Sequence, residues 1–415
     1  MPPSKTHSMR PPTAVLTRGF DPALSVGSAR PAVFRSSTYV FSTPEAAERA
    51  FAILGGRATP EPGEGNDLIY SRFNHPNAEI LEDHMVPLEA GAQAAAVFNS
   101  GMAAIMTSIL TFARPGDQIV YTVPIYGGTQ HFVHEFLEPF GIRGIAIRAG
   151  RGAELEEAIR TAENLRAVLI ETPANPTLKM TDIRAACDAA ASRSERPYVM
   201  VDNTFMGPTF QHPLQLGADI VLYSATKYLG GFSDLLGGFA LSADPQIIRK
   251  IKSRRGLFGN ILQPDECWIL DGRLPTVALR MNRASKNGQR IAERLASHRA
   301  VAKLYYPTLF DDSDQIRIRL AQCDYPGAML SIDLKGGKHA AFEFLRNLKL
   351  ARNAVSLGGV ETLVCHPKST THSSVSEAEL EIAGVTDGLV RVSVGIEDWR
   401  DLLTDFEQAL DCAVP

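Results

Sequence analysis

The stretch Ile220-Val-Leu-Tyr-Ser-Ala-Thr-Lys-Tyr-Leu-Gly-Gly231 decides the fold of this chain. Its first residues, 220–223, form a short apolar run with β-branched and aromatic side chains, which is typical of a buried strand. A lysine, Lys227, follows at the carboxyl end of that strand. Because open α/β sheets bind ligands at the carboxyl ends of their strands, we expect this stretch to form one wall of a ligand site.

Similar apolar runs recur along the chain and predict an α/β fold. Helical patterns such as Gly128–Glu138 and Asp182–Ala191 separate them. Strands that alternate with helices form a mostly parallel sheet with helices on both faces. The expected strands are Ala95–Phe98, Gln118–Tyr121, Ala167–Ile170, Tyr198–Val201, Ile220–Tyr223 and Gly238–Leu241.

The pattern changes after Leu274 and predicts a smaller α+β domain in the C-terminal part. Val277–Val301 has the spacing of one long helix with Arg and Lys on its polar face. The elements expected after it are the strand Met329–Leu334, a helix around Ala340–Asn347, the strand Leu389–Val394 and the helix Arg400–Cys412.

Residues 1–69, in contrast, look irregular, and Ala58–Asn66 has the Pro and Gly content of a loop or mobile arm. We therefore expect three parts in this chain. They are an N-terminal arm, 1–74, a large domain, 75–278, and a small C-terminal domain, 279–415.

Charge and composition exclude several classes of function. The net charge of −4 gives no reason to expect nucleic acid or a membrane as partner, and the ten histidines lack the spacing of a metal site. Five cysteines, none in a CxxC pair, fit reduced thiols in a cytoplasmic protein better than disulfides. Gly91–Ala113 has no charged side chain, but its polar residues favour a buried strand, turn and helix over a membrane span.

Lys227 has the neighbours that imine chemistry needs. A buried lysine readily loses its proton and becomes a nucleophilic amine. The glycine pairs that follow it let the backbone approach a flat ligand closely, and Ser224 and Thr226 carry hydroxyls suited to a phosphate. The alternative is an exposed lysine after a strand.

Two other polar positions also follow apolar runs. Asp202 could pair with the nitrogen of a pyridine ring and keep it protonated, while a helix cap is the alternative. Ser100-Gly101-Met102 opens a helix, so its free N–H groups and the helix dipole could bind an anion. A plain turn between strand and helix is the alternative there.

Three more residues complete the candidate site. Tyr126 could stack on a ring, Asn175 could donate to a phenolic oxygen, and Arg391 could clamp a carboxylate. An ordinary loop tyrosine, a turn-forming Asn-Pro and a surface ion pair are the respective alternatives. Aromatic, amide, carboxylate and lysine nevertheless come in this order, each after a predicted strand. The combination predicts that Lys227 binds pyridoxal 5′-phosphate (PLP), whose protonated ring is an electron sink.

With these motifs the chain resembles the Cys/Met-metabolism family of PLP enzymes, from about Tyr70 to Asp398. That family includes cystathionine γ-synthase, cystathionine lyases, methionine γ-lyase and homoserine-ester sulfhydrylases. The motifs that carry the resemblance are Tyr-Ser-Arg at 70–72, Ser-Gly-Met at 100–102, Tyr-Gly-Gly-Thr at 126–129, Glu-Thr-Pro-Ala-Asn-Pro-Thr at 171–177, Val-Asp-Asn-Thr at 201–204, Ser-Ala-Thr-Lys at 224–227, Ser-Leu-Gly-Gly at 356–359 and Arg-Val-Ser-Val-Gly-Ile-Glu at 391–397.

The resemblance implies the PLP-dependent aspartate-aminotransferase-like fold (fold type I) and a role for each site residue. Lys227 would hold the cofactor and shuttle protons, and Tyr126 would stack on its ring and help to activate the substrate. The other implied contacts are Gly101, Met102, Ser224 and Thr226 at the phosphate, Asp202 and Thr204 on the ring side, and Asn175, Ser356 and Arg391 at the substrate carboxylate or cofactor edge.

The same resemblance implies an assembly. Tyr70 and Arg72 would reach the phosphate in a neighbouring subunit, so we expect a homotetramer built from catalytic dimers. The N-terminal arm would then be a clasp between subunits.

Four positions depart from the family's usual pattern. Gly128 stands where methionine γ-lyases carry Cys, and Val355 stands where γ-synthases and cystathionine γ-lyases usually have Glu. The usual Asn-Pro-Thr and Gly-His-Ser-Asp are Asn74-His-Pro-Asn77 and Gly231-Phe-Ser-Asp234 here. The cofactor residues are intact, whereas positions that face the substrate vary.

The family reaction is γ-elimination or γ-replacement on a sulfur-containing or O-acyl-homoserine amino acid. Lys227 would remove the Cα proton, and a second proton loss at Cβ would expel the γ-substituent. The vinylglycine-like intermediate that remains either adds a thiol or hydrolyses to 2-oxobutanoate and ammonia. Cystathionine γ-synthase, O-acylhomoserine sulfhydrylase and a non-catalytic binding protein on the same fold remain alternatives, and no GxGxxG supports a dinucleotide enzyme.

Overall fold

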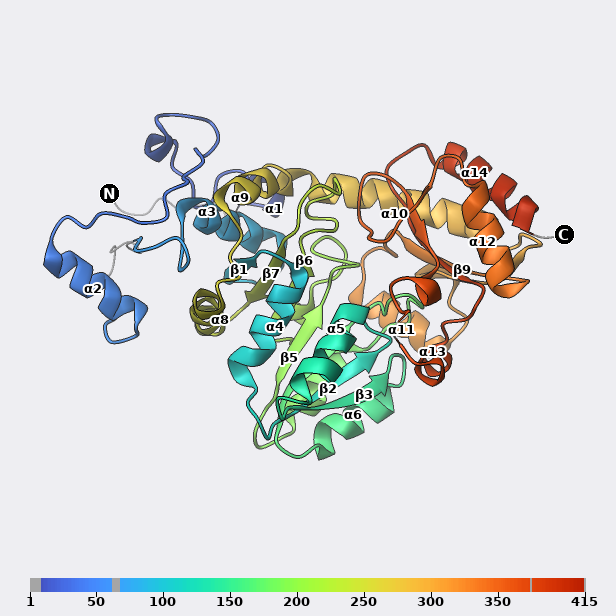
Figure 1. Ribbon diagram of the computed structural model, residues 1–415, viewed down its shortest axis with the longest axis horizontal. Helices are drawn as coiled ribbons and strands as arrows, with labels where there is room; N and C mark the ends of the chain where they lie inside the picture. Colours follow the sequence, from blue (N-terminus) through green and yellow to red (C-terminus); the bar gives the residue numbers. More distant parts are fainter. Residues whose placement is uncertain (1–8, 62–67, 374, 414–415) are drawn as a thin grey trace.

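A seven-stranded sheet forms the centre of the computed structural model, which describes residues 9–61, 68–373 and 375–413 (Figure 1). Its strand order is β1-β7-β6-β5-β4-β2-β3, and only β7 runs against the others. The strands are β1 (Ala94–Phe98), β2 (Gln118–Val123), β3 (Arg143–Arg148), β4 (Leu165–Glu171), β5 (Tyr198–Asp202), β6 (Ile220–Ser224) and β7 (Gly238–Ser242). The mostly parallel sheet and all six expected strands are confirmed. The edge strand β3 was not expected, because its partly exposed residues lack a long apolar run.

Helices cover both faces of this sheet, as its continuous apolar strands require. In β4, Leu169 packs into the core with α4 and α8, while Val168 and Ile170 pack on the opposite side with α6 and α7. The helices around the sheet are α3 (Pro76–Met85), α4 (Gly101–Phe112), α5 (Gly127–His131), continued by the π-helical turn Phe132–Leu137, α6 (Gly152–Thr161), α7 (Ile183–Ala191), α8 (Pro245–Phe258) and α9 (Pro264–Asp271). Gly91–Ala113 therefore contains β1 and α4, and no helix in the described part of the chain combines the length and apolar character of a membrane span.

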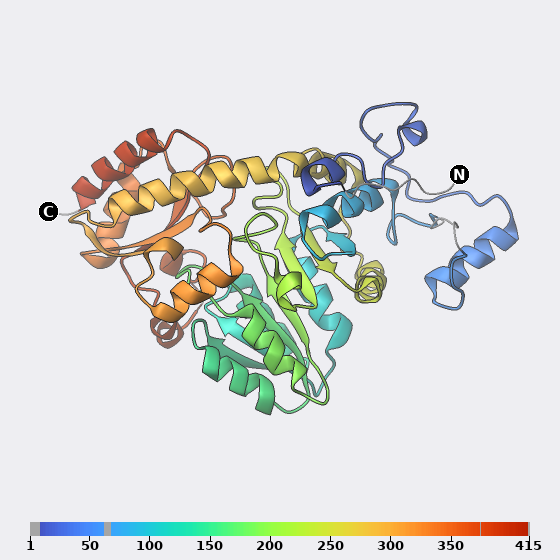
Figure 2. The same cartoon turned by 180° about the vertical axis from the view of Figure 1, so that it is seen from behind.

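A second sheet of five strands, in the order β10-β11-β12-β9-β8, follows in the C-terminal part. Figures 1 and 2 show α10 running along the top of the molecule from the large sheet toward this one. The strands are β8 (Val301–Tyr305), β9 (Met329–Leu334), β10 (Arg352–Asn353), β11 (Leu363–Cys365) and β12 (Leu389–Ser393). The helices are α10 (Val277–Leu295), α11 (Ser313–Gln322), α12 (Gly337–Asn347), α13 (Glu377–Ala383) and α14 (Trp399–Ala413).

The single helix expected over Val277–Val301 is wrong at its end. The helix α10 stops at Leu295, and β8 starts at Val301, which pairs with Leu334 of β9. Both Leu295 and Val301 are buried, each in its own element. Pairing with β9 makes Val301–Tyr305 a strand, and a local sequence pattern cannot predict that long-range contact.

The description of residues 1–69 as irregular is also wrong in part. They include the short helix α1 (Pro11–Ala14) and the longer α2 (Pro44–Leu54), which stands off the rest of the molecule in Figure 1. The hydroxyl of Thr43 caps α2 by accepting from the N–H of Ala46. Residues 62–66 of the loop expected at Ala58–Asn66 lie outside the described residues.

Candidate active site

Lys227 lies in the turn that follows β6, and its amine is mostly shielded from solvent. Its Nζ donates a hydrogen bond to Oγ of Ser356, at 2.9 Å. Burial, and then the charge of the nearby Arg391, lower the pKa of Lys227 to about 8 against the opposing charge of Asp202. The amine is therefore neutral far more often than that of a surface lysine, which makes it a competent nucleophile and base.

Arg391 and Ser356 lie near this amine and belong to the C-terminal part of the chain, which contains the five-stranded sheet. Arg391, in β12, is only 3% exposed and donates to Oδ1 of Asn175 at 3.0 Å and to the backbone oxygen of Ser356 at 2.8 Å. Its Nε has no hydrogen-bond partner among the described residues. The buried guanidinium is thus held in place with donor capacity to spare, and the alternative of a surface ion pair is wrong.

Asp202 ends β5 and faces Lys227 across the neighbouring strand end. Its Oδ1 accepts from the backbone N–H of Thr204 at 3.1 Å and from the Thr204 hydroxyl at 2.6 Å. That hydroxyl in turn accepts from the N–H of Ser224 at 2.9 Å, so it joins the ends of β5 and β6. No α-helix begins here, so the helix-cap alternative is wrong. Burial raises the pKa of Asp202, which the hydrogen bonds from Thr204 oppose.

The first turn of α4 lies against the end of β6. Ser100 caps the helix by accepting from the N–H of Ala103, and a Cβ on Gly101 would lie 2.8 Å from Cβ of Ser224. Only glycine allows this approach. Met102 follows in the same turn, and the Thr226 hydroxyl accepts from the N–H of Gly237 at 3.1 Å nearby. The free N–H groups of this turn and the hydroxyls of Ser224 and Thr226 therefore lie where an anion could bind.

Tyr126 presents its ring beside this turn and is 44% exposed. Gly128 makes room for it, because a Cβ there would lie 2.6 Å from Cε1 of Tyr126. The backbone N–H of Tyr126 donates at 2.9 Å to a carboxylate oxygen of Glu171, at the end of β4. The ring itself is free to stack on a planar ligand.

Two buried residues near the site were not predicted from the sequence. Glu171, which is 5% exposed, accepts from the N–H groups of Tyr126 and Asn175. His372 is also buried, and burial followed by the charge of Arg391 lowers its pKa to about 4, so it is neutral at physiological pH. The signal for Glu171 was present, since it ends an apolar strand as Asp202 does; His372 gave none.

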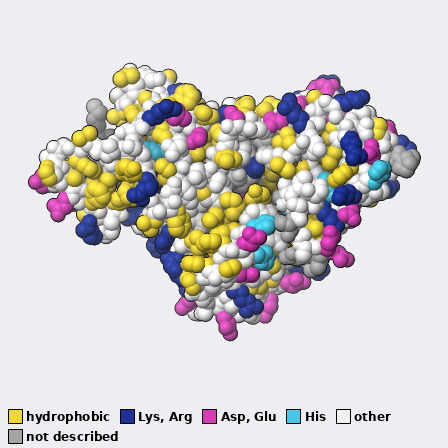
Figure 3. All heavy atoms as spheres, viewed as in Figure 1, with side chains coloured by type: hydrophobic (Ala, Val, Ile, Leu, Met, Phe, Trp, Pro, Cys, Tyr) yellow, Lys and Arg dark blue, Asp and Glu magenta, His cyan; other side chains and the backbone are white. Residues whose placement is uncertain are grey.

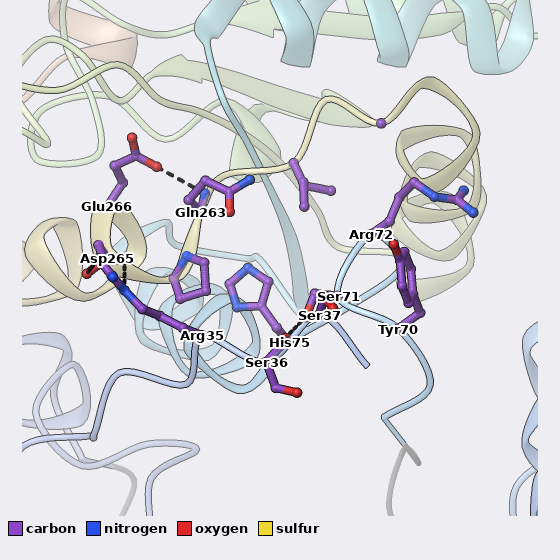
Figure 4. A pocket seen from close by; sticks show the side chains of 13 residues that line it. Arg35, Ser36, Ser37, Tyr70, Ser71, Arg72, His75, Gln263, Asp265 and Glu266 are labelled. Atoms are coloured by element: carbon purple, nitrogen blue, oxygen red, sulfur yellow. Dashed lines mark hydrogen bonds and ion pairs between the residues drawn. The ribbon is translucent and has the colours of Figure 1, made fainter. Parts of the chain in front are cut away.

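Tyr70 and Arg72 do not join the Lys227 cluster of their own chain. They line a cavity of ≈ 780 Å³ together with Arg35, His75, Gln263 and Asp265 (Figure 4). Arg72 donates to the backbone oxygen of Gly256 at 2.5 Å, and its guanidinium carbon lies 5.8 Å from the Tyr70 ring centre. No described contact connects either side chain with Lys227 or Ser224.

A second cavity, of ≈ 980 Å³, is lined by Thr226, the residue before Lys227, and by Ser356, its hydrogen-bond partner. Its walls combine apolar and charged side chains. They include Thr226, Leu236, Arg352, Val355, Ser356 and Glu361. No cluster of three or more metal-ligating side chains occurs within the described residues.

These groups fit PLP. Asp202 keeps Oδ2 free of any described hydrogen bond, which suits a pyridinium N–H. The first turn of α4 suits the phosphate, the ring of Tyr126 suits a stacked pyridine, and Lys227 supplies an amine of lowered pKa.

Comparisons with known proteins agree with this geometry. The family model described as Cys/Met metabolism PLP-dependent enzyme matches residues 12–411. The chain is 37% identical to L-methionine gamma-lyase of Porphyromonas gingivalis over 92% of each chain. It is 41% identical to cystathionine gamma-lyase of Bacillus subtilis over 85% of this chain and 91% of that protein.

A solved structure gives the same result for the fold. Cystathionine gamma synthase from Xanthomonas oryzae pv. oryzae, in complex with cystathionine, superposes with a TM-score of 0.87 at 31% identity and covers 98% of both chains. The chain therefore belongs to the Cys/Met-metabolism family of PLP-dependent enzymes.

Proposed function

We propose that this enzyme catalyses γ-elimination or γ-replacement on a sulfur-containing or O-acyl-homoserine amino acid, with Lys227 as the group that moves the proton at Cα. One observation carries the proposal. The amine of Lys227 has a lowered pKa and is bonded to Ser356, whose backbone oxygen accepts from the buried guanidinium of Arg391. A base and a carboxylate-binding group therefore lie side by side.

Each residue of the proposed site has its own role in the reaction. PLP, when bound, supplies an aldehyde that captures the substrate amine and a ring that delocalises negative charge from Cα. Arg391, oriented by Asn175, binds the substrate carboxylate and so directs the Cα proton toward Lys227. Neutral Lys227 takes that proton and returns one later. Asp202 keeps the pyridine nitrogen protonated, and Tyr126 holds the ring from its face.

The names of the relatives support lyase chemistry, since two of them are a methionine and a cystathionine γ-lyase. The solved γ-synthase holds cystathionine, which keeps cystathionine γ-synthase as the alternative, with O-acylhomoserine sulfhydrylase beside it. Val355 and Leu236 give the cavity an apolar wall that suits a thioether. Arg352 and Glu361 in the same cavity suit a substrate with a charged distal end.

The test is a product analysis. The purified enzyme with PLP is incubated with methionine, cystathionine or an O-acyl-homoserine, with and without a thiol, and the products are identified by mass spectrometry. We expect 2-oxobutanoate without thiol, or a new thioether with it. Neither product from any substrate would overturn the proposal, and a colourless protein that binds amino acids unchanged would favour the non-catalytic alternative.

We further propose a cytoplasmic homotetramer built from catalytic dimers, with the arm 1–74, the large domain 75–278 and the small domain 279–415 as its parts. Tyr70 and Arg72 lie away from the Lys227 cluster of their own chain, which supports a role in a neighbour's site. Hydrophobic side chains gather over α2 in Figure 3, where Phe51 and Leu54 are exposed. Light scattering on the purified protein measures the number of subunits.

A further inference from the structure

We propose that Glu171 is a positioning residue whose carboxylate fixes the ring-stacking Tyr126 and the carboxylate-binding Asn175–Arg391 pair relative to each other. The inference rests on the proposed function and deepens it. It gives one buried side chain control over both the cofactor ring and the substrate carboxylate.

The geometry at Glu171 uses both carboxylate oxygens. Oε1 accepts from the backbone N–H of Asn175 at 2.8 Å, and Oε2 accepts from the backbone N–H of Tyr126 at 2.9 Å. The two donors come from different loops, one after β2 and one after β4. Because backbone amides cannot rotate away as side chains do, these bonds hold the two loops at a set distance. Both bonds strengthen when the carboxyl group is ionised, because hydrogen bonds to a charged acceptor are the strong ones.

A series of contacts leads from Glu171 to the reacting amine. Asn175 accepts from Arg391 through Oδ1, at 3.0 Å. Arg391 donates to the backbone oxygen of Ser356 at 2.8 Å, and Lys227 donates to the Ser356 hydroxyl at 2.9 Å. A shift of the Asn175 loop therefore moves the guanidinium that binds substrate, and with it the residue that holds Lys227.

The identity of the side chain follows from the same geometry. Glu171 pairs directly opposite Asp202 in the sheet, so two carboxyl groups lie on adjacent strand ends. Burial, and then the charge of Asp202, raise the pKa of Glu171 to about 8, so ionisation is costly here and the group is mostly protonated at neutral pH, while the N–H groups of Tyr126 and Asn175 favour its ionised form. Glutamine would avoid that cost, but its amide has one oxygen and could satisfy only one of the two N–H donors. Glutamate is the side chain that has two acceptor oxygens and is long enough to contact both N–H groups.

The experiment compares Glu171→Gln with Thr122→Val. The Thr122 hydroxyl accepts from the backbone N–H of Glu171 at 3.0 Å, so the control removes a buried hydrogen bond at the same strand end and leaves the carboxylate alone. Three quantities are measured: the Kd of the apoenzyme for PLP, the visible circular dichroism of bound PLP, and KM against kcat for the amino-acid substrate.

We expect Glu171→Gln to lose about half or more of the dichroism and to raise KM about tenfold, as the loss of one hydrogen bond to the carboxyl group predicts. Thr122→Val should stay within about twofold of the wild type in all three quantities. Glu171→Asp, which keeps the carboxyl group but is too short to reach both amides, should fall between them. If Glu171→Gln fails to fold, the same three quantities are measured on Glu171→Asp instead.

Wild-type dichroism, Kd and KM in Glu171→Gln or Glu171→Asp would overturn the inference. So would equal losses in Thr122→Val, since they would indicate general loosening of the strand end. A wild-type enzyme that binds PLP but turns over no substrate would end the proposed function instead, while the Kd and dichroism would still test Glu171.

Discussion

The Lys227 cluster and the Tyr70–Arg72 segment differ in how completely this chain builds them. Around Lys227, Asp202 and Arg391, each polar side chain is held by another residue of the same chain. Tyr70 is 42% exposed, and the one hydrogen bond described for the Arg72 side chain goes to a backbone oxygen. Contacts within one chain hold the first region together, whereas no described contact connects the Tyr70 and Arg72 side chains with it.

The largest effect is expected at the centre of the first region. On the proposed role of Lys227, its replacement with alanine removes the amine that would hold PLP and move the proton, so kcat should fall on the order of 10³-fold or more. The visible absorption of bound PLP should disappear, and borohydride should no longer fix the cofactor. Absorption spectra before and after borohydride measure this, and surviving colour would contradict the central role of Lys227.

Arg391→Leu should come next. On the proposed role of Arg391, the variant loses two charge-assisted hydrogen bonds to the substrate carboxylate, which costs about 3 kcal/mol or roughly 10²-fold in KM. PLP binding should change little, because Arg391 contacts Asn175 and Ser356 rather than the phosphate turn. Arg391→Lys is the matched control and should recover part of the affinity. A lower kcat with an unchanged KM would indicate that the substrate carboxylate binds elsewhere.

Arg72→Ala tests the second region directly. It should raise the Kd for PLP about tenfold through the loss of one charged phosphate contact, with the Lys227 chromophore still formed. The variant is then mixed with Lys227→Ala protein under conditions of subunit exchange. If Arg72 serves a neighbour, roughly a quarter of the sites regain both residues and activity rises. Mixtures no more active than Arg72→Ala alone would place both residues in one chain.

The smallest effect concerns pH. The pKa of Lys227 is lowered to about 8, and only the neutral amine attacks the PLP aldehyde. The rate of PLP uptake by apoenzyme should therefore rise about fivefold between pH 7 and 8 and level off above that range. Stopped-flow absorbance measures it. A rate that kept rising to pH 10 would indicate a lysine with an ordinary pKa.

Much of this site could be predicted because parallel strands bring their carboxyl ends together. Asp202 and Lys227 each follow an apolar run, so their proximity followed once the sheet was assigned. Glu171 also ends an apolar strand, so its place at the site could be predicted in the same way, but its role could not, since its partners are backbone N–H groups that no side-chain pattern marks. The change from helix to strand between Leu295 and Val301 also depends on a distant partner, β9.

Ser356 has a consequence for any attempt to make this enzyme more heat-resistant. It holds a left-handed backbone with φ of +85°, a conformation that costs a residue other than glycine about 1–2 kcal/mol. Glycine would relieve that strain, although its greater freedom in the unfolded chain would return part of the gain. It would also delete the hydroxyl that holds Lys227. Selection for thermal tolerance and selection for turnover therefore pull this position in opposite directions, and Ser356→Gly should melt higher while working more slowly.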